Sequence, residues 1–281
     1  MEAELLQTML KYAHDAGSIA RSEQHDLDAH LKDDDSYVTS VDTRLSELAF
    51  EAFRGVVPAE SIITEEQLDN LERISRTHGA EDELLLIVDP IDGTRNYFHG
   101  MPLYGISVAL LRGRRPWLGV VTFPGLGETF YADGTAAFFV RNAYGSDAHT
   151  QRLEPVSREL NKNSVVLYAN SFARRYRFSY SVCTMMLTAC VTLNSRWPTI
   201  GRGIGTVFTD HIWDFAGSWP ILHHLGFELR GTVSGSRMTH YRPEDYDPVT
   251  HRTHEPILVC RPEHFERLRS AISEAEGLPG T

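Results

Sequence analysis

Residues 104–140 form a succession of apolar, β-branched and aromatic segments separated by short turns. They read "YGISVALLRGRRPWLGVVTFP" and "ETFYADGTAAFFV", with turn signals at Gly-Arg-Arg and Ala-Asp-Gly. Strands joined by such short turns pair antiparallel with their sequence neighbours, because parallel pairing needs a long crossover. The segment therefore predicts an antiparallel meander. The apolar run "ELLLIV" before it predicts a buried strand that ends at Asp89.

Helices are expected on the N-terminal side of this meander. In the first, apolar residues recur at helical spacing from Leu6 to Ala20. A second helix would have Ser40 or Asp42 as its N-cap and would stop at Pro58. The segment "SIITEEQLDNLERI" predicts a short strand and a third helix. Residues 1–145 are thus predicted to be an α+β half in which helices pack on an antiparallel sheet.

The C-terminal half, residues 146–281, alternates predicted strands and helices. "NSVVLYAN" and "PILVC" predict strands, and "YSVCTMMLTACVTL", "DFAGSWPILHHLG" and "PEHFERLRSAISEAE" predict helices. Gly226 stands where a left-handed cap is expected to end one helix. Such alternation is typical of α/β structure. No repeat or long linker separates the halves, so we expect them to pack as one unit.

Composition limits the classes of function. The net charge of −11 disfavours nonspecific nucleic-acid binding, because no basic excess exists to neutralise phosphates. An acidic protein can still bind an anion if metal ions supply positive charge. Three cysteines without CxxC spacing predict no disulfide framework and favour the cytoplasm. The charged N-terminus predicts an amphipathic helix, neither a signal peptide nor a membrane span.

The segment "DPIDGT", residues 89–94, carries two carboxylates three positions apart. Pro90 removes a ladder donor, so the strand is expected to end there. Asp89 and Asp92 can then converge with the Ile91 carbonyl, and such hard oxygen ligands suit Mg²⁺ or Mn²⁺. Gly93 allows close backbone approach, and a helix starting at Thr94 would offer N–H groups to an anion. The alternative is an Asp-rich turn in which Asp92 caps the next helix.

Two other acidic segments have both a structural and a functional interpretation. Asp214, in "HIWDFAG", is expected to cap a helix, and an N-cap carboxylate keeps acceptor capacity for a metal. Glu65 and Glu66 follow Thr64, which has capping-box spacing with Gln67, so they could simply complement a helix dipole.

Together these segments resemble the inositol monophosphatase family. The similar motifs are "ITEE", "DPIDGTRNYFHGMP" and "WDFAG", in this order, and "HDAGSIARSE" at residues 14–23 is similar to the family's first helix. The resemblance covers nearly the whole chain. It implies a Mg²⁺-dependent, lithium-sensitive phosphatase of the superfamily that includes fructose-1,6-bisphosphatase. It also implies a layered αβαβα sandwich of the sugar-phosphatase type and a homodimer.

The resemblance implies a metal site of four acidic residues and one carbonyl. Glu65 and Asp89 would hold one ion with the Ile91 carbonyl. Asp89, Asp92 and Asp214 would hold a second. Four converging carboxylates cannot all stay ionised in a cleft without cations, and a phosphate could not enter an unneutralised acidic pocket. Two divalent ions resolve both difficulties and clamp the attacking and leaving oxygens.

The resemblance also implies catalytic and substrate-binding roles. Glu65 and the Thr94 hydroxyl would position the attacking water, through a third, looser metal site in many members. Asp42 is similar to a family aspartate near the nucleophile, and a cap at a helix start is its equally weighted alternative. The implied catalytic residues are Glu65, Thr94 and Asp42. The implied substrate-binding residues are Asp92, Gly93, Thr94 and Asp214.

The substrate pocket departs from the members that are specific for inositol phosphate. Gapless counting places Val207 where those members carry a glutamate, and Cys183 and Met185 where they carry Gly and Ala. The pocket is therefore expected to be reshaped and less polar. Arg174, Arg175 and Arg177 could contact a second anion or form a solvated edge. The histidines show no metal spacing, although His211 could touch the substrate.

These observations predict a cytoplasmic, Mg²⁺-dependent phosphomonoesterase that acts on a small polyol, cyclitol or sugar phosphate. A nucleotide or amino-alcohol phosphate, such as 3′-phosphoadenosine 5′-phosphate or histidinol phosphate, is the alternative substrate class. A non-catalytic regulatory protein on the same scaffold is the third hypothesis. Neither nucleic acid nor a membrane is expected as a partner.

Overall fold

The computed structural model describes residues 2–25, 29–31, 37–71 and 80–275. The continuation of the predicted third helix after residue 71 falls outside these ranges, as do the acidic run at residues 33–35 and the C-terminal tail. Within the described residues, no helix is both long and apolar enough to cross a bilayer.

A seven-stranded sheet carries the N-terminal half. Its strands lie in sequence order, the first pair parallel and all others antiparallel. The predicted meander is thus confirmed. The strands are β3 (Ile62–Thr64), β4 (Leu84–Asp92), β5 (Gly105–Arg112), β6 (Arg115–Phe123), β7 (Glu128–Ala132), β8 (Ala137–Arg141) and β9 (His149–Arg152).

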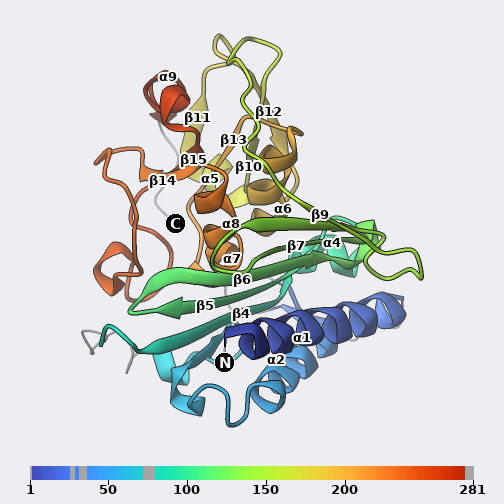
Figure 1. Cartoon of the computed structure of the whole chain (residues 1–281). Coiled ribbons are helices and arrows are strands. Elements are labelled where there is room, and N and C mark those ends of the chain that lie inside the picture. The colour runs from blue at the N-terminus through green and yellow to red at the C-terminus, as the bar shows by residue number, and fades with distance from the viewer. Residues whose placement is uncertain (1, 26–28, 32–36, 72–79, 276–281) are drawn as a thin grey trace.

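Helices α1 (Glu2–Glu23) and α2 (Ser40–Ala52) cover one face of this sheet (Figure 1). Their apolar sides form one core with β4, β5 and β6, in which Met9, Leu45 and Leu86 are buried. Burial of such side chains is the main source of their helical stability. The N-cap residue of α2 is Thr39. The sequence predictions of Ser40 and Asp42 as N-cap are therefore wrong, by one and by three positions.

A layer of three short helices covers the other face. These helices are α6 (Val191–Arg196), α7 (Ile212–Ala216) and α8 (Trp219–His224). They share a core with both sheets, including Phe130, Phe215 and Val259. Gly119 allows the close approach, because a Cβ there would lie 2.3 Å from the Gly217 carbonyl oxygen.

The C-terminal half adds a second sheet beyond these helices. Its order is β12-β10-β13-β15-β14, with β12, β10 and β13 parallel and β15 antiparallel to both neighbours. The strands are β10 (Val165–Tyr168), β12 (Thr184–Leu187), β13 (Gly205–Phe208), β14 (Glu228–Gly231) and β15 (Ile257–Cys260). Helices α5 (Asn170–Arg175) and α9 (Phe265–Arg269) share a core with its other face. The expected αβαβα layering is confirmed (Figure 1).

Smaller elements complete the chain. They are α4 (Thr94–Phe98), the strand pairs β1 (Ala29–Leu31) with β2 (Tyr37–Thr39) and β11 (Tyr176–Phe178) with β16 (Ile272–Glu274), and 3₁₀ turns at Ala59–Ser61, Pro124–Leu126, Trp197–Ile200, Pro243–Asp245 and Pro262–His264. Because β9 pairs with β8, the first sheet extends past residue 145. The division into halves at 145 stays a prediction.

Several predicted helices are shorter or interrupted. In "YSVCTMMLTACVTL" residues 184–187 form an edge strand, because short apolar runs do not distinguish strand from helix. Ala189 has φ 56, and α6 begins only after it. The helix predicted from 214 to 226 restarts at α8, where Pro220 has no N–H to continue the ladder. The last helix ends at Arg269, before β16. Gly226 has φ 76, as expected.

Candidate metal and phosphate site

The end of β4 places the first two carboxylates. The strand does not stop at Pro90 as predicted but continues to Asp92 through a register shift between Asp89 and Asp92. A proline is tolerated at such an irregularity, where no ladder donor is required. The Ile91 N–H donates to Asp89 Oδ1 at 3.0 Å. The shift thereby brings both aspartates to the same side of the sheet end.

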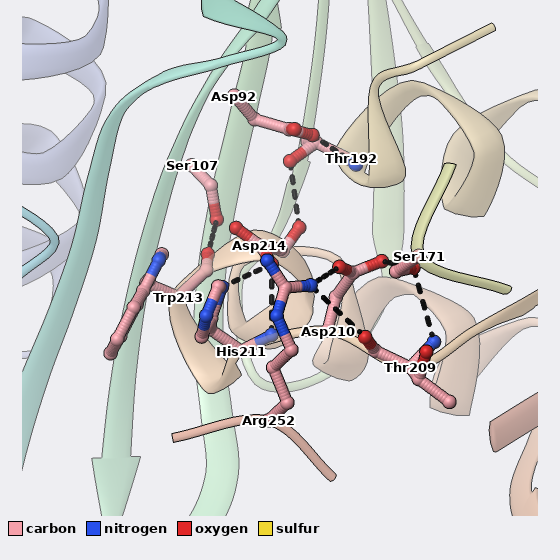
Figure 2. A network of polar contacts seen from close by, with 10 residues as sticks. All are labelled: Asp92, Ser107, Ser171, Thr192, Thr209, Asp210, His211, Trp213, Asp214 and Arg252. Carbon is pink, nitrogen blue, oxygen red and sulfur yellow. Dashed lines mark hydrogen bonds and ion pairs between the residues drawn. The ribbon is translucent and has the colours of Figure 1, made fainter. Parts of the chain in front are cut away.

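Asp214 approaches these residues from α7. It is not the residue before the helix, as predicted, but lies in its first turn, in a capping box with His211. The His211 N–H donates to Asp214 Oδ2 at 2.9 Å, and His211 Nδ1 lies 3.2 Å from the same oxygen. The Trp213 carbonyl accepts from the buried Ser107 hydroxyl of β5 at 3.0 Å, which fixes α7 against the first sheet (Figure 2).

The three aspartates converge although they come from distant parts of the sequence. One carboxylate oxygen each of Asp89, Asp92 and Asp214 lies within 4.8 Å of the others, and all three residues are buried. Asp89 Oδ2 is buried and has no hydrogen-bond partner within the described residues. A buried acceptor without a partner is costly, so an unpaired carboxylate oxygen among other carboxylates indicates a place for a cation.

The electrostatics of the cluster agree with this interpretation. Burial, followed by the charges of Glu65, Asp92 and Asp214, raises the pKa of Asp89 well above its usual value. Burial and then the Asp214 charge raise the pKa of Asp92 to about 7. Burial also opposes ionisation of Asp214, but the hydrogen bonds and charge of His211 outweigh it and hold that pKa low. The donor set is all oxygen, which fits Mg²⁺ or Mn²⁺.

Glu65 and Asp42 lie next to this cluster. Glu65 follows β3, and its N–H donates to the Val88 carbonyl of β4 at 3.3 Å. Its charge acts on both Asp89 and Asp42, so the three carboxylates share one electrostatic environment. Burial first, and then Glu65, raises the pKa of Asp42 to about 7 against the hydrogen bonds from Thr39.

Thr94 connects Asp42 to the metal loop. Its hydroxyl lies 2.8 Å from the Ile91 carbonyl oxygen, to which it donates, and 3.4 Å from Asp42 Oδ1. Asp42 Oδ2 meanwhile accepts from the Thr39 N–H at 2.8 Å. The two interpretations of Asp42 are therefore compatible, since one oxygen stabilises the start of α2 and the other faces Thr94.

Gly93 has φ 86 and forms the N-cap of α4. A Cβ at this position would lie 3.1 Å from the Leu103 carbonyl oxygen and 3.2 Å from Cys190 Cβ. Left-handed geometry and tight surroundings both require glycine here. Helix α4 begins at Thr94, directly after Gly93, as the sequence predicted. The phosphate cradle itself stays a prediction.

Residues from the start of α6 complete the surroundings of Asp92, and the sequence analysis missed them. The Thr192 N–H donates to Asp92 Oδ2, and Cys190 Sγ donates to the same oxygen at 3.2 Å. The Thr192 hydroxyl donates to the Asp214 carbonyl at 2.7 Å (Figure 2). Cys190, and not the predicted Cys183 or Met185, is the residue of this segment at the site.

The residues proposed by gapless counting lie elsewhere. Cys183 and Val207 are buried in the core between the second sheet and α5 and α9. Met185 is in β12, at the edge of that sheet. For Cys183 and Met185 the reason is that the segment before Cys190 is a strand and a left-handed turn rather than a helix. Cys190 is the N-cap residue of α6, and its Sγ accepts from the Leu193 N–H at 3.4 Å. Recognition of this capping position in the sequence would have identified Cys190 as a residue of the site.

A second polar network adjoins Asp214 (Figure 2). Arg252 forms an ion pair with buried Asp210 at 2.5 Å and donates to the Thr209 carbonyl at 3.2 Å. The Ser171 hydroxyl donates to Asp210 Oδ2 at 2.7 Å. This network ties the loop before α7 to α5 and to the C-terminal loop. His211, which has no metal-ligand spacing in the sequence, has a ring nitrogen within 4.8 Å of a carboxylate oxygen of both Asp210 and Asp214.

The three arginines at 174, 175 and 177 differ in their surroundings. Arg177 donates to the Ala173 and Tyr176 carbonyls, at 2.9 and 3.0 Å. Arg174 and Arg175 are exposed on α5. These contacts favour the interpretation as a solvated edge. A second anion site on these residues stays untested.

The fold defines a class of layered αβαβα proteins, and this chain carries a cluster of buried carboxylates within it. The chain belongs to the inositol monophosphatase family, whose sequence model matches residues 1–276.

Known relatives agree with this assignment. The chain is 35% identical over 136 residues to a histidinol-phosphatase of Chlorobaculum parvum, covering 47% of this chain and 49% of the relative. It is 39% identical over 103 residues to a fructose-1,6-bisphosphatase/inositol-1-monophosphatase of Thermotoga maritima, covering 36% of each. The matched stretches thus span half or less of these relatives. An IMPase structure from Thermotoga maritima superposes with a TM-score of 0.74 at 21% identity, covering 95% of this chain and 96% of that one.

Proposed function

We propose that the chain is a Mg²⁺-dependent phosphomonoesterase that hydrolyses the phosphate ester of a small alcohol. The observation that carries the proposal is the unpaired, buried Oδ2 of Asp89 among carboxylates whose pKa values are raised. Such a cluster is compatible with ionised aspartates only when cations are bound. Two or three ions per site are expected, and Mn²⁺ is a possible substitute for Mg²⁺.

Each residue of the site has a defined part in this proposal. Asp89, Asp92 and Asp214 hold divalent cations, with Glu65 and the Ile91 carbonyl as further ligands. The bound cations supply Lewis-acid activation of water and neutralise charge on the transferring phosphoryl group.

The remaining residues position the reactants. Thr94 orients the attacking water, and Asp42 Oδ1 keeps the Thr94 hydroxyl in place. The N–H groups of Gly93 and Thr94 donate to phosphate oxygens beside Asp92 and Asp214. Water then attacks phosphorus in line with the departing alcohol, and no covalent intermediate with the protein is required.

Two classes of alcohol remain as candidates. Polyol, cyclitol or sugar phosphates follow from the family as a whole and from the bifunctional relative. Nucleotide or amino-alcohol phosphates are favoured by the histidinol-phosphatase relative. A homodimer in the cytoplasm, without nucleic-acid or membrane partners, completes the proposal.

The test is release of inorganic phosphate from a panel of these esters. We expect turnover with Mg²⁺, none with EDTA, and suppression by lithium. If calorimetry shows Mg²⁺ bound and no ester is hydrolysed, the chain is a non-catalytic scaffold and the proposal is wrong.

A further inference from the structure

Thr192 forms hydrogen bonds to two of the aspartates that are proposed to bind metal (Figure 2). It lies in the first turn of α6 and is fully buried. Its N–H donates to Asp92 Oδ2, at the end of β4, and its hydroxyl donates to the Asp214 carbonyl of α7 at 2.7 Å. One residue of the middle helical layer thus connects a proposed ligand on the first sheet with a proposed ligand on a neighbouring helix.

The short length of α7 explains why its carbonyl groups need such partners. The last four carbonyls of an α-helix have no partner within the helix, and α7 has only five residues. The Asp214 carbonyl accepts from Thr192, and the Trp213 carbonyl accepts from the Ser107 hydroxyl at 3.0 Å. In the pairing of β4 with β5, Ser107 is the partner of Asp89. Side chains from outside the helix therefore determine where α7, and with it Asp214, lies.

The contact made by Thr192 is the more direct of the two. Ser107 connects α7 with a strand pair, whereas Thr192 contacts the Asp92 carboxylate itself and the backbone of Asp214. The Asp92 oxygen that accepts from Thr192 also accepts from Cys190 Sγ at 3.2 Å, so the orientation of this carboxylate is fixed. Loss of the Thr192 hydroxyl would leave Asp92 in place and release Asp214 from it.

The spacing of the carboxylates matters more for some cations than for others. One oxygen each of Asp89, Asp92 and Asp214 lies within 4.8 Å of the others. Mg²⁺ requires nearly ideal octahedral geometry with oxygen ligands at about 2.0–2.1 Å, whereas Ca²⁺ accepts irregular coordination at about 2.3–2.6 Å. Relaxing the spacing of carboxylates that are otherwise held in place therefore weakens Mg²⁺ binding more than Ca²⁺ binding.

We propose that Thr192 is a positioning residue that fixes the spacing of Asp92 and Asp214 and thereby makes the site selective for Mg²⁺. The inference rests on the proposed function for the presence of a divalent cation at these aspartates. Because Thr192 acts on the metal ligands and not on the phosphate ester, its role can be measured without a substrate.

Thr199 provides a matched control for the loss of a buried hydroxyl. Its hydroxyl donates to the Arg196 carbonyl at 2.6 Å, the residue is 1% exposed, and it lies in the turn that directly follows α6. Thr192→Val and Thr199→Val each remove one hydroxyl from a side chain of nearly unchanged size and leave one carbonyl without its donor. Each should therefore lower the thermal midpoint in EDTA by about 2–6 °C.

Calorimetric titration of Mg²⁺ and of Ca²⁺ into the metal-free protein, without substrate, measures the effect on the site. Thr192→Val should lower the affinity for Mg²⁺ by about tenfold or more, as is typical for loss of a group that orients a metal ligand. The affinity for Ca²⁺ should fall by less than about threefold, so the ratio of the two affinities changes. Thr199→Val should change neither affinity. Thr192→Ser, which keeps the hydroxyl, should retain the Mg²⁺ affinity to within about threefold of wild type.

Equal losses of Mg²⁺ affinity in the two valine variants would contradict the positioning role, because the loss would then reflect stability alone. Loss of Mg²⁺ and Ca²⁺ affinity by the same factor in Thr192→Val would contradict the role in selectivity. Should Thr192→Val not fold, Thr192→Ala is compared with Thr199→Ala in the same titrations.

These titrations also separate this inference from the proposed function. If the expected pattern of affinities is found but wild type hydrolyses no ester, only the proposed function fails. If wild type hydrolyses esters and Thr192→Val binds Mg²⁺ as wild type does, only this inference fails. Absence of Mg²⁺ binding to wild type would overturn both.

Discussion

Asp42 and Asp214 are both held in a fixed orientation by a capping contact at the start of a helix. Each is the third residue of its helix, and each uses Oδ2 to accept the N–H of the N-cap residue. The capping contact fixes the carboxylate in one orientation and occupies only one of its oxygens. In Asp42 the second oxygen faces Thr94, and we propose that in Asp214 the second oxygen binds a cation. A local stabilising motif therefore also positions a reactive group.

Asp89→Asn tests the centre of the proposed metal site. Burial and the neighbouring carboxylates raise the pKa of Asp89 well above its usual value in the metal-free protein and so disfavour its charged form, which means that the neutral amide replaces it with little effect on folding. We expect the thermal midpoint in EDTA to change by less than about 2 °C and kcat to fall by about 10³-fold or more. The increase in midpoint that Mg²⁺ causes in wild type should be lost. Full activity of the variant would rule out the assignment.

The metal-free protein should become less stable as the pH rises from about 4 to about 7. The pKa values of Asp42 and Asp92 are about 7 in the folded protein, whereas an unfolded aspartate has about 3.9. In this window the folded state therefore holds protons that the unfolded state releases, and stability falls with pH. Mg²⁺ should reverse the trend, because it binds the deprotonated forms. Thermal midpoints in EDTA and in Mg²⁺ at pH 5.5 and pH 8 check both signs.

At the scale of elements, the end of β4 and the start of α4 act as one unit. The register shift at Asp89–Asp92 and the left-handed Gly93 turn the chain from the sheet into the helix within a few residues. A regular strand would direct alternate side chains to opposite faces. The irregularity is what allows Asp89 and Asp92 to share one site.

Gly93→Ala should lower both activity and stability, with Gly100→Ala as its matched control. Both glycines have positive φ, 86 and 72, so each substitution costs about 1–2 kcal/mol of backbone strain. Only at Gly93 does the new Cβ meet neighbours within 4 Å. We expect Gly93→Ala to be the more destabilising in urea and to reduce kcat/KM at least about tenfold. Equal effects of the two substitutions would contradict the role of close packing at the site.

The sequence predicted best those features that follow directly from the chemistry and conformational preferences of neighbouring residues. The acidic residues, Gly93 and the meander could be predicted, because carboxylate spacing, glycine and short turns have direct structural consequences. Cys190 and Thr192 could not, because their role depends on where α6 starts. Arg252 could not be connected with Asp210, since that contact forms only when distant loops meet. The roles of such residues depend on packing between segments that are distant in the sequence, and local sequence patterns do not show that packing.

At the scale of the whole molecule, the site depends on the middle helical layer. Asp92 belongs to the first sheet, but its hydrogen-bond donors Cys190 and Thr192 lie at the start of α6, and Asp214 lies on α7. Both helices share a core with both sheets. The relative position of the sheets therefore sets the distances between the carboxylates.

Gly119→Ala should disturb this arrangement from the far side of α7. The added Cβ would lie 2.3 Å from the Gly217 carbonyl oxygen and 2.6 Å from Pro220 Cγ, at the junction of α7 and α8. Overpacking of this kind costs about 1–3 kcal/mol, so the thermal midpoint should fall by at least about 3 °C. Displacement of α7 should also weaken Mg²⁺ binding, measured by calorimetry. An unchanged midpoint would show that sheet and helices are not in tight contact there.

The separation of the ligands along the chain has a consequence during synthesis. Asp89 and Asp92 leave the ribosome long before Asp214, and Thr192 follows them only after the whole first sheet has been made. A nascent first half would expose mutually repelling carboxylates without the groups that organise them. If the proposed function holds, magnesium can bind only late in translation, and a prematurely terminated chain is expected to carry neither the ion nor activity.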